Sequence, residues 1–134
     1  MGVLSWLGLE SEPEKDPIEI DDTSFVKTLK NSKVPVVIDV WSDNCPHCHK
    51  LVPTIKKLTA KYEDRALITH MNISTNPKSA GKLRVKGTPT VVIYDGQGRE
   101  YERVVGVRGQ HFYEEILNEM LPAAEDTEKV QDNS

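Results

Sequence analysis

The stretch "VVIDVWSDNCPHCHK" (residues 36–50) decides the fold class, because it joins an apolar run to a pair of cysteines. The β-branched run at 34–40 is typical of a strand that is buried on both faces. From about 44 to 63, apolar residues recur at helical spacing and predict a helix. Both cysteines of the chain, Cys45 and Cys48, therefore lie where a buried strand turns into a helix.

The rest of the pattern extends this unit into an α/β domain. Helices are predicted at 21–32, 76–85 and 109–121, and strands at 66–73, 88–94 and 99–107. Asp22 or Thr23 is the expected N-cap of the first of these helices. The strand–helix–strand order implies a parallel pair, and "DGQG" before the last strand implies a hairpin. We expect a central mixed sheet of four to five strands with helices on both faces.

Length and charge favour one domain with two polar ends. The 134 residues suffice for a single core. Residues 1–17 are interpreted as an N-terminal extension and acidic linker, 18–121 as the domain, and 122–134 as a disordered acidic tail. Net charge is −6 over 1–22, −3 over the tail and +5 between them. A body this weakly basic argues against nucleic-acid binding.

The N-terminus predicts neither export nor membrane insertion. No basic residue precedes its short apolar part, and no run approaches the roughly 20 apolar residues that span a bilayer. We therefore expect a cytoplasmic protein. Residues 1–9 are too apolar for a free tail, and three roles stay open for them: docking on the core, contact with a membrane surface, or contact with a partner.

The string "CPHCH" fits a redox dithiol, a c-type haem attachment site or half of a zinc site. A dithiol requires an activated thiolate, and the first turn of a helix supplies one through free N–H groups and the helix dipole at Cys45. Cys48 lies one turn deeper, where a resolving thiol belongs. Pro46 suits the first helical position, and His47 offers the thiolate a positive charge or a hydrogen bond.

The competing interpretations need additional features. Haem attachment would use Cys45, Cys48 and His49 and would require export. Zinc would require four ligands, and the candidates beyond the cysteines are His47, His49 and His70. Two unreactive buried thiols are the third alternative. The dithiol is favoured because a strand precedes the pair and a helix follows it.

Over about residues 18–121 the chain resembles the thioredoxin family. "VVIDVWSDNCPHC" is similar to the family's strand, tryptophan loop and CxxC helix start, and "GTPT" to its cis-proline segment. The further matching landmarks are the aspartate six residues before the first cysteine, the loop tryptophan, the proline that kinks the active-site helix and the glycine after the last strand: Asp39, Trp41, Pro53 and Gly106. Their number and order make the resemblance more specific than CxxC alone.

The resemblance implies a role for each matched residue. Cys45 would attack a substrate disulfide and Cys48 would resolve it, leaving a redox-active Cys45–Cys48 disulfide. Asp39 would be a buried carboxylate that moves the Cys48 proton, with a raised pKa. Substrate would bind at four further residues, among which the proline is cis and the threonine pairs through its backbone: Trp41, Thr88, Pro89 and Gly106.

The resemblance also implies partners. The chain would reduce protein disulfides as a monomer and be recharged by a thioredoxin-reductase-like donor, with no metal and no cofactor besides the disulfide.

Three departures from the family pattern affect the expected reduction potential of the cysteine pair. Asn44 replaces a usual tryptophan, Pro46–His47 replaces Gly-Pro, and His70 stands where many thioredoxins carry a lysine. Pro-His is similar to the dipeptide of the bacterial periplasmic disulfide oxidant. We predict a potential less reducing than the roughly −270 mV of a typical thioredoxin. An oxidase or isomerase, or a non-catalytic binding module of the same fold, remains the alternative.

Overall fold

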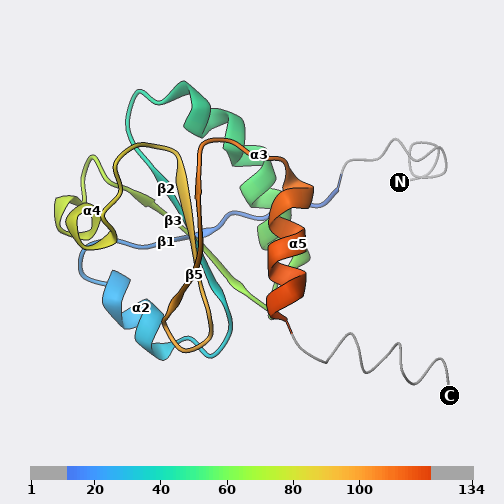
Figure 1. The fold of residues 1–134 in the computed structure, drawn as a ribbon. Helices are drawn as coiled ribbons and strands as arrows, with labels where there is room; N and C mark the ends of the chain where they lie inside the picture. Colours follow the sequence, from blue (N-terminus) through green and yellow to red (C-terminus); the bar gives the residue numbers. More distant parts are fainter. Residues whose placement is uncertain (1–11, 122–134) are drawn as a thin grey trace, which may run out of the picture.

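The structure, a computed structural model, describes residues 12–121. Its strands form one five-stranded sheet in the order β1-β3-β2-β4-β5 (Figure 1). The strands are β1 (Ile18–Glu19), β2 (Val36–Trp41), β3 (Leu67–Asn72), β4 (Thr90–Tyr94) and β5 (Glu100–Val105). The helices are α2 (Phe25–Asn31), α3 (Pro46–Lys61), α4 (Pro77–Leu83) and α5 (Gln110–Met120).

The sheet is mixed, as the sequence predicts. β2 pairs in parallel with β3 and antiparallel with β4, and β4 pairs antiparallel with β5. In the hairpin turn, the Asp95 carboxylate accepts hydrogen bonds from the backbone N–H groups of Gln97 and Arg99. The fifth strand is β1, which pairs in parallel with β3 over two residues. The predicted fold class, a mixed sheet of four to five strands, is confirmed.

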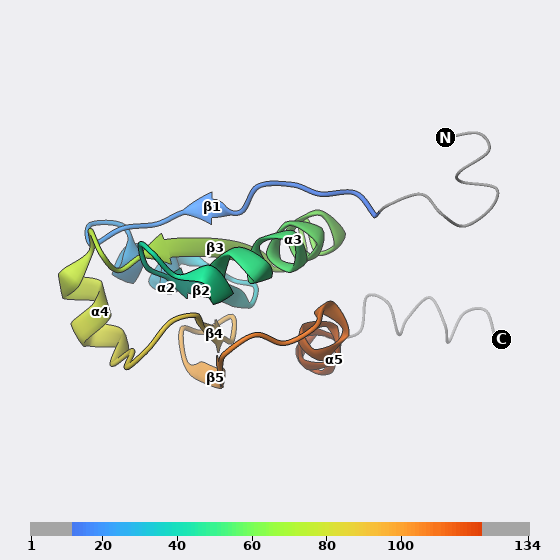
Figure 2. The same cartoon turned by 90° about the horizontal axis from the view of Figure 1, so that it is seen from above.

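Helices cover both faces of the sheet, with α3 and α5 on one side and α2 and α4 on the other (Figures 1 and 2). Side chains alternate along β2 between the two cores. Val37 packs with α3 and α5, whereas Val36, Ile38 and Val40 pack with α2 and α4. Asp39 lies two residues after Val37 and therefore on the same face of the sheet. Its carboxyl group points toward α3, the helix that carries Cys48.

The cap predicted for the first helix is wrong. Helix α2 begins after Ser24, and the Asp21 carboxylate accepts hydrogen bonds from the backbone N–H groups of Thr23 and Ser24. The Asp22 carboxylate instead accepts hydrogen bonds from the backbone N–H and hydroxyl of Ser79, in the first turn of α4. A local pattern misassigned Asp22 because its partner lies 57 residues away in the sequence.

Helix α3 continues through Pro53, which lies inside it. In residues 12–121 no helix is long and apolar enough to cross a membrane. The predictions for residues 1–9 and for the tail 122–134 fall on parts of the chain outside the described residues.

Candidate active site

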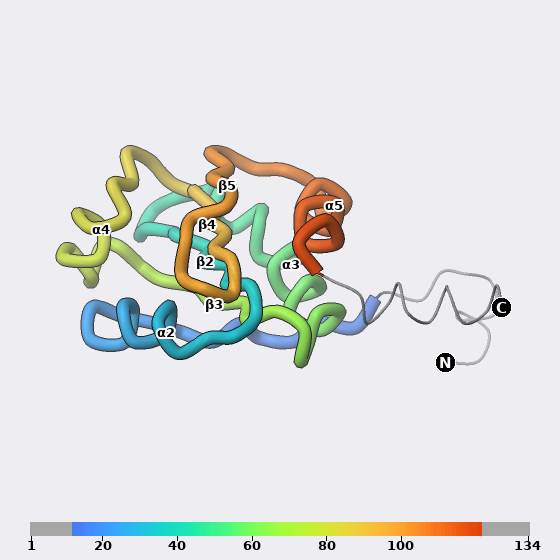
Figure 3. The backbone as a smooth tube through the Cα atoms, turned by 60° about the horizontal axis from the view of Figure 1, so that its bottom comes forward, coloured from blue at the N-terminus to red at the C-terminus, as the bar shows by residue number. Residues whose placement is uncertain are grey.

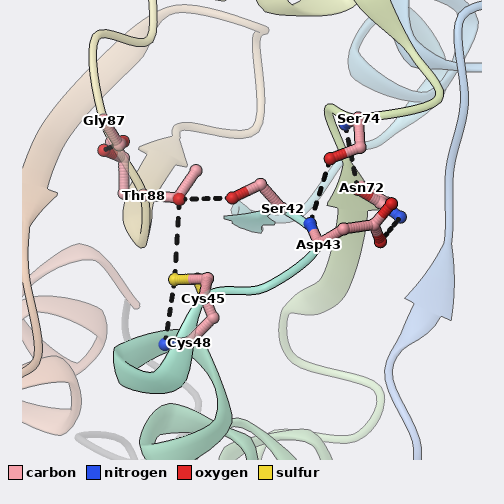
Figure 4. The surroundings of a disulfide bond; sticks show 9 residues. Ser42, Asp43, Cys45, Cys48, Asn72, Ser74, Gly87 and Thr88 are labelled. Atoms are coloured by element: carbon pink, nitrogen blue, oxygen red, sulfur yellow. Dashed lines mark hydrogen bonds between the residues drawn. A yellow bond between two sulfur atoms is a disulfide. The ribbon is translucent and has the colours of Figure 1, made fainter.

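Cys45 is the N-cap of α3, and Pro46 occupies the first turn as predicted. The preceding residue, Asn44, has φ 58°. This is the left-handed region, which asparagine tolerates better than most residues. The Cys45 Sγ accepts a hydrogen bond from the backbone N–H of Cys48 at 3.2 Å (Figure 4). That N–H lies in the first turn of α3 and also donates to the Cys45 carbonyl oxygen at 3.1 Å. Together with the positive end of the helix dipole, it stabilises negative charge on the sulfur.

The two cysteines form a disulfide, with their Cα atoms 5.3 Å apart. The pairing predicted from the resemblance is thus confirmed. Both residues are buried, Cys45 at 8% exposed and Cys48 at 5%.

The loop before β4, 43 residues further along the chain, contacts the same sulfur. The Thr88–Pro89 bond is cis, as predicted. The Thr88 hydroxyl donates to the Cys45 Sγ at 3.5 Å and lies 2.7 Å from the Ser42 hydroxyl (Figure 4). Gly106, at φ 91°, donates its N–H to the Pro89 carbonyl oxygen at 2.9 Å. The cis-proline loop therefore contacts Cys45, and the residue after β5 in turn holds that loop.

The loop that carries the cysteines is anchored to the end of β3. The backbone N–H of Asp43 donates to the Ser74 hydroxyl at 3.0 Å, and the Asn72 amide donates to the Asp43 carboxylate at 3.1 Å (Figure 4). The Asn72 side-chain oxygen accepts from the Ser74 N–H. These bonds fix the position from which the chain enters α3.

Behind the disulfide lies a cavity of about 440 Å³. Asp39, Trp41, Cys48 and His70 are among its lining residues. Asp39 is 5% exposed, and its Oδ1 has no hydrogen-bond partner within residues 12–121. Burial raises the pKa of Asp39 to about 7, because a charged carboxylate is poorly solvated there. The predicted burial and raised pKa of Asp39 are both confirmed.

His70 lies beside Asp39 on the neighbouring strand, since the two are register partners in β3 and β2. The Trp41 indole N–H donates to His70 Nδ1 at 3.1 Å, and the two rings stack at 6.1 Å between centroids. A nitrogen that accepts this bond carries no proton, so the bond favours neutral His70. Burial also lowers the pKa of His70.

The histidines of "CPHCH" are both exposed. Within residues 12–121, neither histidine forms a hydrogen bond with Cys45 in this oxidised state. The role of His47 in tuning the thiolate therefore stays a prediction. His49 borders the cavity, on the side of Cys48. No group of three or more His, Cys, Asp or Glu side chains in the described part of the chain is arranged to hold a metal ion.

The structure thus brings together the predicted residues Cys45, Cys48, Asp39, Trp41 and Pro89. It also shows three side-chain contacts that the sequence did not predict, made by the hydroxyls of Ser42 and Thr88 and by the imidazole of His70 with Trp41. Thr88 was expected to act through its backbone. The motif "GTPT" marked the segment, but no sequence pattern indicated that its hydroxyl touches sulfur.

A buried CxxC disulfide at the start of a helix, in a sheet of this order, defines a thiol–disulfide oxidoreductase. The family model described as Thioredoxin matches residues 16–119. The chain belongs to the thioredoxin family.

Individual relatives agree with this assignment. Thioredoxin 2 of Chlorobaculum tepidum is 31% identical over 103 residues, which cover 77% of this chain and 94% of that protein. Thioredoxin of Synechocystis sp. is 28% identical over 88 residues, covering 66% and 81%. The bifunctional thioredoxin reductase/thioredoxin of Mycobacterium leprae is 27% identical over 105 residues, which cover 78% of this chain but 23% of that much longer protein.

Proposed function

We propose that the protein reduces protein disulfides through the Cys45–Cys48 dithiol. The observation that carries the proposal is the placement of the Cys45 sulfur. It caps α3, accepts the Cys48 N–H and receives the Thr88 hydroxyl. Both hydrogen bonds favour the thiolate over the thiol, and the thiolate is the nucleophile.

In the first step the Cys45 thiolate attacks one sulfur of the substrate disulfide. The substrate S–S bond breaks, the departing thiolate takes a proton, and a mixed disulfide with Cys45 remains. Cys48 then loses its proton to the Asp39 carboxylate and attacks the Cys45 sulfur. The second substrate thiol leaves, and the Cys45–Cys48 disulfide forms. Two electrons have passed to the substrate.

Asp39 suits this proton transfer because its pKa is about 7. A base whose pKa lies near neutral pH is partly ionised there and still accepts a proton readily. The cavity that Asp39 shares with Cys48 leaves space for water between the two groups.

The remaining roles follow the same proposal. Trp41, Thr88, Pro89 and Gly106 form the surface on which substrate binds, and Pro46 and His47 tune the thiolate. The disulfide is the only redox group required. A reductase of the kind fused to the Mycobacterium leprae relative would return electrons to it. We place the protein in the cytoplasm, as a monomer.

Oxidation or isomerisation of disulfides is the second candidate, and the Pro46–His47 dipeptide favours it. The two directions differ in reduction potential. We predict that equilibration of Cys45–Cys48 with glutathione gives a potential less negative than about −270 mV. A value at or below that figure would remove any argument from the dipeptide.

Turnover of insulin with dithiothreitol tests the proposed function. Wild type should accelerate insulin reduction, and Cys45→Ser should fall to the rate of dithiothreitol alone. Lys57→Ala, a change on the same helix away from the cysteines, serves as the matched control and should retain the wild-type rate. A non-catalytic binding module would give no acceleration with any of the three proteins.

A further inference from the structure

A second hollow, of about 590 Å³, lies between the α4–β4 loop and the edge strand β5. Residues of this loop and of the edge strand β5 line it: Arg84, Lys86, Gly87, Thr90, Glu100, Arg103 and Val105. We name these residues the basic groove. Figure 3 traces the loop from α4 into β4, with β5 beside it.

The charges of the basic groove do not cancel. The Glu100 carboxylate is engaged by Arg103 through two hydrogen bonds of 2.9 Å, so this pair is neutral. Arg84 and Lys86 are both exposed and have no acidic partner among residues 12–121. Two uncompensated cations therefore border the groove.

The basic groove borders the loop residue that contacts the reacting sulfur. It begins at Gly87, directly before Thr88, whose hydroxyl touches the Cys45 Sγ. Gly87 is exposed, and a Cβ built on it would meet nothing within 4 Å, so the surface there is open to an incoming chain. A polypeptide bound to Cys45 through its own cysteine can extend past Gly87 into the groove.

Resting on the proposed reductase function, we propose that the basic groove selects disulfide substrates whose cysteine is flanked by an acidic polypeptide segment. The carboxylates of that segment pair with Arg84 and Lys86, while Val105, which is 63% exposed, offers apolar contact. Because the pairs are exposed to solvent, each contributes modestly and weakens with salt. The preference is one of association rather than of chemistry.

Synthetic peptides test this selection with the full-length protein. Three peptides of equal length carry the same intramolecular disulfide, flanked on one side by three Glu, three Gln or three Lys. We expect kcat/KM for the Glu peptide to exceed that for the Lys peptide by about tenfold at low salt, and the ratio to approach one at high salt. An equal rate for Glu and Lys peptides at low salt would overturn the proposal.

Variants assign the preference to the groove. The double variant Arg84→Gln/Lys86→Gln should lose most of the gain for the Glu peptide and leave the Gln peptide within about twofold. Lys27→Gln/Lys30→Gln removes two exposed lysines from α2 and should keep the preference. Loss of the preference in both double variants would show a net-charge effect and contradict the groove. Failure of wild type to reduce even the Gln peptide would instead count against the proposed reductase function.

Discussion

At the scale of the residue, Asp39 occupies a position where ionisation is unfavourable. Five apolar residues surround it in the sequence of its strand, and the structure buries its carboxyl group without a partner for Oδ1 in residues 12–121. A buried carboxyl group without a hydrogen-bond partner lowers the stability of the folded protein at any pH at which it is charged. The same burial that would suit Asp39 to the proposed role of a base therefore opposes folding at neutral and alkaline pH.

Asp39→Asn should stabilise the protein, and the gain should depend on pH. The folded pKa of about 7 lies above the ordinary value of 3.8, so the folded state holds a proton that the unfolded state releases between these values. Below pH 3.8 the wild-type protein loses nothing through Asp39. As pH rises from 3.8 to 7, the free energy of unfolding of the wild-type protein falls by up to about 4 kcal/mol, since each pKa unit corresponds to roughly 1.4 kcal/mol. Urea unfolding at about pH 4 and pH 8 measures the difference.

The exposed Asp64 gives the control, because Asp64→Asn also removes one negative charge. Relative to wild type, only Asp39→Asn should be more strongly stabilised at pH 8 than at pH 4. Asp39→Asn should also slow insulin reduction. A gain of equal size at both pH values would show that the Asp39 carboxyl group ionises normally in the folded protein.

At the scale of the element, the end of β5 supports the cis-proline loop. Gly106 donates its N–H to the Pro89 carbonyl from a φ of 91°, a conformation that side chains disfavour. Gly106→Ala should therefore destabilise the protein by about 1 kcal/mol or more. Gly81→Ala, inside α4 with nothing within 4 Å of the added Cβ, should stabilise it by about 0.5–1 kcal/mol. Thermal unfolding of both variants gives the comparison, and the same sign for the two would refute the strain at Gly106.

Most elements were predictable because their apolar residues form local patterns, either a continuous run or a helical stripe. β2 and β4 are short continuous runs, and α3 and α5 carry a helical stripe. β1 was not predictable as an element, because its two residues are exposed and only their pairing with β3 makes them a strand. The Thr88–Cys45 contact was beyond prediction for a similar reason. It joins loops 43 residues apart in sequence, and local patterns do not describe such contacts.

At the scale of the whole molecule, residues 12–121 contain a complete five-stranded sheet with a hydrophobic core on each face. The two cores lie on opposite faces of one sheet, and the start of the described chain is tied to α3 where the Lys15 N–H donates to the Lys56 carbonyl. A domain that has its own hydrophobic core can fold independently of the segments that flank it.

We therefore predict that residues 12–121 alone fold and reduce insulin. Deleting 1–11 and 122–134 together should shift the unfolding temperature by no more than about 4 °C, the effect of roughly 1 kcal/mol in a domain of this size. Single deletions of each end identify the source of any larger change. Loss of cooperative unfolding after deletion of 1–11 would show that the apolar N-terminal segment belongs to the core.

We propose above all that Cys45 attacks the substrate and that Cys48 resolves the mixed disulfide. Mass spectrometry of Cys48→Ser mixed with a disulfide-containing peptide tests this directly, because without Cys48 the mixed disulfide cannot be resolved and should accumulate. We predict a stable mixed disulfide between the peptide and Cys45, and no such adduct on Cys48 in Cys45→Ser. An adduct that forms on Cys48 in Cys45→Ser, with none in Cys48→Ser, would contradict the assignment.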